Sequence, residues 1–252
     1  TWTVISGTAT LSSLTTANAS VTGLIPGTSV TLRWTIASGA CTPSTDDIII
    51  NISSLITTAN AGTDKNLCNA ATSQLSGNTP TVGVGTWTLI AGTATITAPL
   101  SPTTTVTGLT AGTTATLRWM VVSPGCSTSN DDMIITNNAL PTTADAGTDQ
   151  TLCNSATATL NANVAAIGIG TWSVVSGSAV ITTLHSETSG ITSLINGTTA
   201  TLKWTITNGN CPATSDNVTI QIDDVPTIAA AGADQNLCNT TTANMTANSA
   251  GV

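Results

Sequence analysis

Six cysteines are the residues of this chain whose spacing most directly predicts chemistry. They form two series, and within each series one cysteine follows another after 85 residues. The first series is Cys41, Cys126 and Cys211, and the second is Cys68, Cys153 and Cys238. Cysteines that recur in this way are typical of disulfides that stabilise small domains outside the reducing cytosol. Zinc is disfavoured as their partner, because the chain has no Cys-x-x-Cys motif and one histidine.

The repeat predicts one disulfide inside each copy of the unit. The expected pairs are Cys68 with Cys126, Cys153 with Cys211, and Cys238 with Cys41 of the next unit. Each bond would close a loop of 58 residues, which a chain-entropy model values at roughly 4 kcal/mol of stability. The alternative is that each pair consists of reduced, buried thiols.

Acidic residues also recur at matching places in the copies. Calcium needs several convergent oxygen ligands, and the candidates for such a site are Asp131, Asp132 and Asp149. The alternative is that an Asp at a strand start or turn bonds to nearby backbone groups. One basic position recurs as well, and its residues are expected to pair with the Asp that opens the following strand: Arg33, Arg118 and Lys203. Such an exposed pair contributes at most about 1 kcal/mol.

No combination of side chains in the chain predicts catalysis. His185 and Glu187 are close in the sequence, but the other copies carry different residues at their places. An isolated surface pair explains them, since no nucleophile accompanies them. We therefore expect a protein that is not an enzyme and that holds no metal or other cofactor.

The charge of the chain limits its partners. The formal net charge is −8, and Lys and Arg together number four. Nucleic acids and anionic membranes bind basic surfaces, so neither is an expected partner. No apolar run approaches the roughly 20 residues of a membrane-spanning helix. The expected partners are other copies of the same chain, with covalent glycans as a further candidate.

Six N-x-Ser/Thr triplets are candidate acceptors for those glycans. They begin at Asn18, Asn51, Asn196, Asn217, Asn239 and Asn244. With 6% charged residues, the surface must be formed mainly by Thr, Ser and Asn, and glycans would help to solubilise it.

The element that positions the first cysteine series is a strand that recurs with it. Residues 113–126 are TTATLRWMVVSPGC, and close variants occupy residues 28–41 and 198–211. Alternation places Leu117 and Trp119 on one face and Arg118 on the other, so the first face is expected to be buried. Tyr and Phe are absent, and the expected aromatic core of the repeats consists of Trp2, Trp34, Trp87, Trp119, Trp172 and Trp204.

Each repeat of 85 residues contains seven short stretches that predict strands. In the second copy they are residues 66–68, 72–76, 85–90, 93–97, 103–109, 114–122 and 131–137. Short strands at spacings near ten residues, with no helical period, predict an all-β fold of tandem β-sandwiches, with three repeats' worth of sequence.

The domain boundaries follow from the same repeat. Residues 61–145 and 146–230 are expected to be complete sandwiches, residues 1–60 the C-terminal part of one, and residues 231–252 the N-terminal strands of a further one. The two incomplete segments are complementary and together lack three residues of a repeat. Two interpretations remain open. Either the chain is a window of a longer periodic protein, or its last strands complete the open sandwich of another subunit.

Three stretches of the third copy carry a resemblance to a known group. They are AGTDQTLCN at 146–154, GTWSVVSGSAVIT at 170–182 and ATLKWTITNGNC at 200–211. The chain resembles the PKD-like and immunoglobulin-like repeats of large secreted, gliding-motility-associated surface proteins of Bacteroidetes. The acidic turn of PKD repeats is replaced here by Ser176-Gly177. The resemblance covers the whole chain and implies export, an adhesin or stalk role, and disulfides between the cysteine pairs.

These observations lead to one functional expectation and one main alternative. We expect a structural repeat of an extracellular filament, fibre or surface stalk, assembled end to end by chain continuation or by strand complementation. The alternative is an adhesin module that binds a glycan or a cell surface through its loops. An accessory domain of an enzyme would need a catalytic neighbour.

Overall fold

The computed structural model describes residues 1–251, which form strands joined by turns and loops without any helix. The chain divides into two compact units, Thr1–Asn137 and Asn138–Val252, and each is described by itself. None of the described residues belongs to a helix that is long and apolar enough to cross a membrane.

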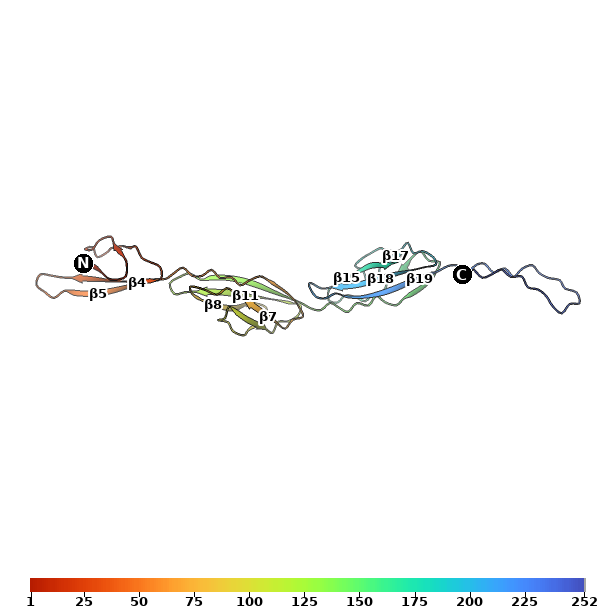
Figure 1. Cartoon of the computed structure of the whole chain (residues 1–252), viewed down its shortest axis with the longest axis horizontal. Helices are drawn as coiled ribbons and strands as arrows, with labels where there is room; N and C mark the ends of the chain where they lie inside the picture. Colours follow the sequence, from red (N-terminus) through yellow and green to blue (C-terminus); the bar gives the residue numbers. More distant parts are fainter. Residues whose placement is uncertain (252) are drawn as a thin grey trace. The chain divides into compact units, whose positions relative to one another are not determined.

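The first unit begins with an antiparallel sheet in the order β1-β4-β5. Its strands are β1 (Trp2–Ser6), β4 (Thr28–Ile36) and β5 (Ser44–Ile52), and the two-residue strands β2 (Thr10–Leu11) and β3 (Val21–Thr22) pair beside it. These strands are red to orange in Figure 1.

A complete sandwich follows in the first unit. One of its sheets has the order β6-β12-β11-β8 and the other the order β7-β10-β9. The bounds are β6 (Lys65–Cys68), β7 (Thr72–Ser76), β8 (Val84–Ala91), β9 (Thr95–Ile96), β10 (Thr103–Thr107), β11 (Thr113–Val122) and β12 (Ser129–Asn138).

The second unit contains the same arrangement one repeat later. Its two sheets have the orders β13-β19-β18-β15 and β14-β17-β16. The bounds are β13 (Gln150–Cys153), β14 (Ala158–Thr159), β15 (Ile169–Ser176), β16 (Val180–Ile181), β17 (Gly190–Thr192), β18 (Thr198–Thr207) and β19 (Thr214–Asp223). β13 pairs with β19 in parallel, whereas β14 with β17, β15 with β18, β16 with β17 and β18 with β19 are antiparallel pairs.

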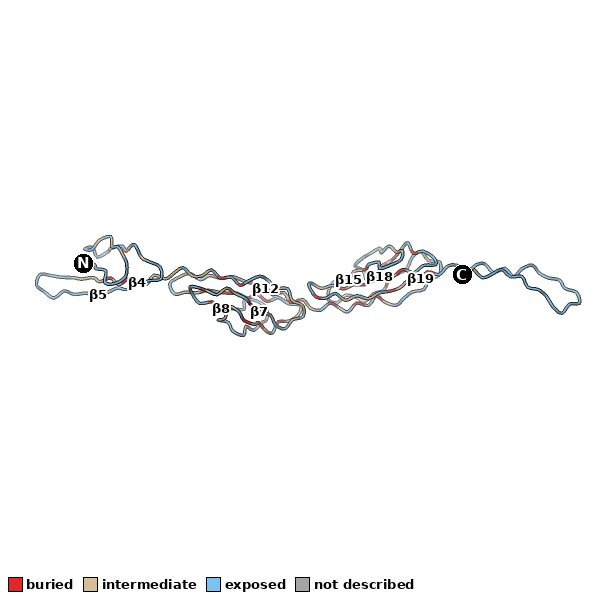
Figure 2. Tube along the Cα trace, viewed as in Figure 1, coloured by how far each residue is buried: buried red, intermediate tan, exposed pale blue. Residues whose placement is uncertain are grey.

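Two tryptophans lie at the centre of each complete sandwich, as the alternation predicted. Trp87 and Trp119 are buried with their ring centroids 5.1 Å apart, and Trp172 and Trp204 are buried with a separation of 5.0 Å. Residues from both sheets pack around them, including Leu75 of β7 in the first complete sandwich. The buried residues, red in Figure 2, therefore lie between two sheets, which confirms the predicted tandem immunoglobulin-like β-sandwiches.

Candidate functional site

The first sheet of the chain exposes an apolar face that the complete sandwiches bury. Trp2 and Trp34 lie 5.0 Å apart, as in the other copies, but both are only half-buried. Ile48 of β5 is 50% exposed, whereas Met133, one repeat later, is 1% exposed. Among the described residues β5 is also an edge strand, so it presents unpaired backbone groups together with this apolar surface. We call residues 1–52 the open sheet.

The last described segment, residues 226–251, is the counterpart of the strands that the open sheet lacks. It forms no strand, and nearly all of it is exposed (Figure 2). Met245 is 79% exposed, whereas Leu75 and Leu160, at the same position in the earlier copies, are fully buried. Leu237 is exposed as well, although its counterpart Leu152 packs against a core. We call residues 226–251 the tail.

The tail already has the local hydrogen bonds of a folded sandwich. In the second unit Asp145 N donates to Asn163 Oδ1 at 2.9 Å, and Asn163 Nδ2 donates to Thr143 O at 2.8 Å. In the tail Ala230 N donates to Asn248 Oδ1 at 2.7 Å, and Asn248 Nδ2 donates to Ile228 O at 3.0 Å. These bonds hold the two arms of the tail together before any sheet covers them. The tail therefore loses less conformational entropy when it docks.

The asparagines that make these bonds were not predicted as site residues, although their recurrence in the sequence marks them. Asn78, Asn163 and Asn248 follow one another at 85 residues. Asn78 makes the same two bonds, accepting from Asn60 N at 2.8 Å and donating to Thr58 O at 2.8 Å. An Asn that recurs with the Trp and Cys positions could therefore have been recognised as a brace between two segments.

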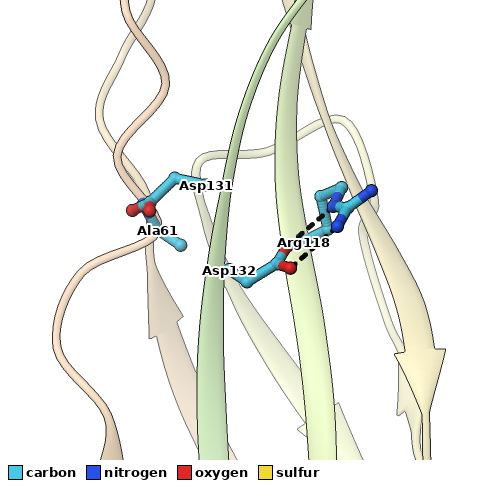
Figure 3. A network of polar contacts seen from close by, with 4 residues as sticks. All are labelled: Ala61, Arg118, Asp131 and Asp132. Carbon is cyan, nitrogen blue, oxygen red and sulfur yellow. Dashed lines mark hydrogen bonds and ion pairs between the residues drawn. The ribbon is translucent and has the colours of Figure 1, made fainter.

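Aspartates join the early and late segments of each complete sandwich. Asp131 Oδ2 accepts a hydrogen bond from Ala61 N at 2.7 Å, and Figure 3 labels both residues. Asp64 Oδ1 accepts one from Ile134 N at 2.8 Å. The positions that correspond to these acceptors are Asp46 in the open sheet and Asp234 in the tail. Each incomplete segment thus carries a carboxylate suited to the backbone of the other.

The three calcium candidates all have structural partners. Asp131 accepts from Ala61 N, and Asp149 Oδ1 accepts from Thr219 N at 2.7 Å. Asp132 receives two bonds from Arg118, at 2.7 and 2.8 Å. Within residues 1–251 no three His, Cys, Asp or Glu side chains gather as metal ligands would. These carboxylates therefore act on the backbone and on Arg118.

The predicted pairing of the basic position occurs in two of the three copies. Arg118 pairs with Asp132 (Figure 3), and Arg33 pairs with Asp47 at 2.7 Å. The hydrogen bond from Arg118 lowers the pKa of Asp132, although burial opposes it, and the positive charge adds to the lowering. Lys203 faces Asn217 across the β18–β19 ladder, so the third copy lacks the carboxylate.

Two disulfide predictions are wrong, because Cys126 and Cys153 carry free thiols. The parallel pairing of β13 places Cys153 opposite Asp223, at the end of β19. Cys211 lies in the hairpin before β19, which begins at Thr214. Nine residue steps of strand span roughly 30 Å, whereas bonded cysteines have Cα atoms less than about 7 Å apart. A bond between Cys153 and Cys211 is therefore geometrically excluded.

The structure assigns the six cysteines different states. Cys68 and Cys211 are disulfide-bonded. Free thiols are recorded for Cys41, Cys126, Cys153 and Cys238. We call Cys68, Cys153 and Cys238 the edge-strand cysteines, and Cys41, Cys126 and Cys211 the hairpin cysteines.

The remaining candidate residues have surface or structural positions. His185 Nδ1 lies 3.0 Å from Gly170 O and 3.2 Å from Thr171 Oγ1, so the ring holds its own loop against β15. Glu187 accepts a backbone bond from Ala162 N through its carbonyl oxygen. The six candidate glycan acceptors, Asn18, Asn51, Asn196, Asn217, Asn239 and Asn244, are all exposed.

Comparison with known proteins gave structural neighbours alone, since no family model and no curated protein match the chain. The chain is similar to extracellular domains 3–5 of Drosophila OTK, with 12% identity over 79% of this chain and 72% of that one, and a TM-score of 0.49. It is similar to titin domains I67–I69, in an E-to-A mutated variant, with 8% identity over 88% of this chain and 86% of that one, and a TM-score of 0.49. It is also similar to the insect immune protein hemolin, with 11% identity over 77% of this chain and 56% of that one, and a TM-score of 0.37. At such identities the fold assignment rests on the sheet order and the core described above.

Proposed function

We propose that this protein is a structural repeat of an extracellular filament, fibre or surface stalk. Its sandwiches follow one another end to end, and strands equivalent to the tail complete the open sheet. Those strands come either from continuation of the same chain or from a second copy. The observation that carries the proposal is the exposure of Met245 and Ile48, whose counterparts are buried together in both complete sandwiches.

The complementarity of the two surfaces favours this assembly over an unrelated partner. Both complete sandwiches bring together residues from the positions of Met245 and Ile48 in one core. Burial of each such side chain is worth about 1.5–3 kcal/mol. Carboxylates at 46 and 234 would then bind backbone N–H groups, as Asp131 and Asp64 do. The partner that best fits both surfaces is thus the repeat sequence of this chain itself.

The alternative of loop-mediated adhesion has less support. Residues 184–191 differ most from the other copies, yet they contain no Trp, Tyr or Phe side chain with which to bind a sugar. An extracellular location follows from the proposed role and from the oxidised cysteines, since disulfides persist mainly in oxidising surroundings.

The proposal is tested by measuring self-association of the reduced chain at increasing concentration by analytical ultracentrifugation. We expect a ladder of oligomers for the native sequence and monomers for Met245→Asp, because a carboxylate at that position cannot enter the core. Val164→Asp is the matched control, since Val164 is exposed on a complete sandwich, and it should assemble normally. A native chain that stays monomeric at every concentration would contradict the proposal.

A second measurement locates the contact. A synthetic peptide of residues 226–251 is added to the chain, and tryptophan fluorescence is recorded. Binding should shift the emission to shorter wavelength, because Trp2 and Trp34 are the half-buried indoles and the other four are already buried. The same peptide with Met245→Asp should cause no shift.

A further inference from the structure

We infer that the disulfides of this protein join successive sandwiches, from the edge-strand cysteine of one to the hairpin cysteine of the next. This inference rests on the proposed end-to-end order and adds a covalent connection to it. It replaces the pairing inside each sandwich, and also the bond from Cys238 to Cys41, which follows the same intradomain pattern.

The edge-strand cysteines lie where the chain leaves a sandwich. Cys153 is opposite Asp223, the last residue of β19, and Asn154 N donates to Asp223 O at 3.0 Å. In the previous copy the backbone of Ala70, two residues after Cys68, is bound on both sides by Asn137. Asn137 Nδ2 donates to Ala70 O at 2.7 Å, and Ala70 N donates to Asn137 Oδ1 at 3.0 Å.

The hairpin cysteines lie where the chain enters a sandwich. The Cys126 thiol donates to Ser54 O at 3.2 Å, and Ser54 follows the end of β5. Cys211 Sγ lies 3.3 Å from the carbonyl oxygen of Ala139, which follows the end of β12. Each kind of cysteine is therefore next to a linker, but one is beside the exit linker and the other is beside the entry linker.

A linker that leaves one sandwich enters the next, so the two kinds of cysteine converge on the same few residues. Asn137 binds the backbone of Ala70, two residues after Cys68, and Cys211 Sγ lies beside the carbonyl oxygen of Ala139. These two cysteines are the ones in a disulfide-bonded state. The pairing rule, which joins the edge-strand cysteine of one sandwich to the hairpin cysteine of the next, therefore pairs Cys68 with Cys211.

The same rule accounts for the four free thiols. Their partners lie in a sandwich that another copy of the repeat supplies. Once the tail has completed the open sheet of the following copy, Cys153 faces Cys41 of that copy, and Cys238 faces its Cys126. Each of these bonds spans the same number of residues along the periodic array as the pair Cys68 and Cys211. Every junction between sandwiches would then carry one disulfide.

Formation of each bond is a two-electron oxidation. Two thiols lose two protons and two electrons as the S–S bond forms, and an exchanging disulfide such as oxidised glutathione accepts them and leaves as two thiols. The Cys126 thiol is half-buried, while Cys41, Cys153 and Cys238 are exposed. Exposure of these three cysteines makes them accessible to such an oxidant before assembly covers the junction.

The test oxidises an assembled mixture of ¹⁵N-labelled and unlabelled chains with oxidised glutathione. After alkylation and digestion with pepsin, linked peptides are identified by mass spectrometry. We expect Cys68–Cys211 peptides of one isotope only, and Cys153–Cys41 and Cys238–Cys126 peptides that also occur in mixed-isotope form. Recovery of Cys68–Cys126, Cys153–Cys211 or Cys238–Cys41 as the main products would overturn the inference.

Serine variants provide the matched control, and their apparent masses are compared in SDS without reductant. Cys153→Ser with Cys238→Ser should reduce the covalent ladder to the 25.0 kDa chain, while Cys68→Ser should leave the ladder intact. Sedimentation separates the two proposals. A chain that does not assemble but yields Cys68–Cys211 disproves the assembly and keeps the pairing rule, whereas an assembled chain with other pairings disproves the rule alone.

Discussion

Gly85 of β8 lies directly against the indole of Trp119, so that a Cβ atom on residue 85 would be 2.0 Å from Cζ2 of the ring. The same relationship joins Gly170 and Trp204, again at 2.0 Å. Since neither glycine has a positive φ, they serve to admit the ring rather than to permit a turn. The space for each central tryptophan is thus made by a missing side chain on the neighbouring strand.

Replacing Gly85 with Ala should destabilise the first complete sandwich by about 3 kcal/mol, the upper part of the range for overpacked cores. The measurement is chemical denaturation followed by tryptophan fluorescence. Gly108→Ala is the control, because a Cβ there meets nothing within 4 Å and costs only the strain of φ +72°. Equal losses in the two variants would show that contact with Trp119 is unimportant.

The two tryptophans of one core should respond differently to Phe. Trp87 Nε1 donates to Pro102 O at 3.1 Å, whereas Trp119 Nε1 is buried without a partner among the described residues. Trp87→Phe should cost about 1 kcal/mol more than Trp119→Phe, because it also leaves a carbonyl without its donor. Unfolding free energies of the two variants give the comparison, and a larger loss for Trp119→Phe would contradict it.

Asp131→Ala should cost about 1–3 kcal/mol of unfolding free energy, because it leaves the buried Ala61 N–H without an acceptor. Asp131→Asn keeps an oxygen at the same place and should recover most of that loss. Hydrogen exchange of the Ala61 amide is the specific readout. Protection that is unchanged in Asp131→Ala would disprove the role of the carboxylate.

The ion pair of Arg118 and Asp132 predicts a dependence on acidic pH. The folded-state pKa of Asp132 is lowered mainly by the hydrogen bond from Arg118. Its stabilisation is therefore present above the ordinary Asp pKa of about 3.9, and it is lost as the pH falls through the lower folded value. Arg118→Met should be destabilised near pH 6 but close to the native chain at pH 2.

The third copy supplies the control for this pH effect. Lys203 faces Asn217, so Lys203→Met should change stability equally at pH 6 and pH 2. Denaturant titrations at the two pH values measure both variants. A constant difference between Arg118→Met and the native chain would show that the pair has no linkage to proton binding.

Asn248→Ala should weaken assembly while leaving the monomer's stability unchanged. Asn248 joins the two arms of the tail, so its loss increases the ordering cost of docking. Asn244→Ala is the control, because Asn244 contributes its backbone oxygen to the bond from Gln235. Dissociation constants from ultracentrifugation should rise several-fold for the first variant and remain unchanged for the second.

Local features of the fold were predictable because they depend on alternation and recurrence. The strand at Thr72–Ser76, the buried face containing Leu117 and Trp119 and the pairing of Arg118 with Asp132 all follow from these two patterns. Each of them involves neighbours in the sequence or on an adjacent strand of a hairpin.

The cysteine pairing was not predictable, because it depends on the direction of a four-residue strand. The residues of β13, QTLC, fit a parallel and an antiparallel edge equally well. An antiparallel β13 would have brought Cys153 to the β18–β19 hairpin and thus to Cys211. Its parallel register with β19 sends Cys153 to the opposite end, and only three-dimensional structure resolves that choice.

That parallel edge also determines how a sandwich responds to tension. β13 is the first strand after the chain enters, and β19 is the last before it leaves. A pull on the two ends drives the strands past one another along their axes, because they run in the same direction. The ladder bonds from Gln150↔Ile220 to Cys153↔Asp223 are then loaded simultaneously in shear rather than opened one after another. The sandwich of the second unit is in this sense a mechanical clamp, and its resistance to extension is set by the four residues of β13.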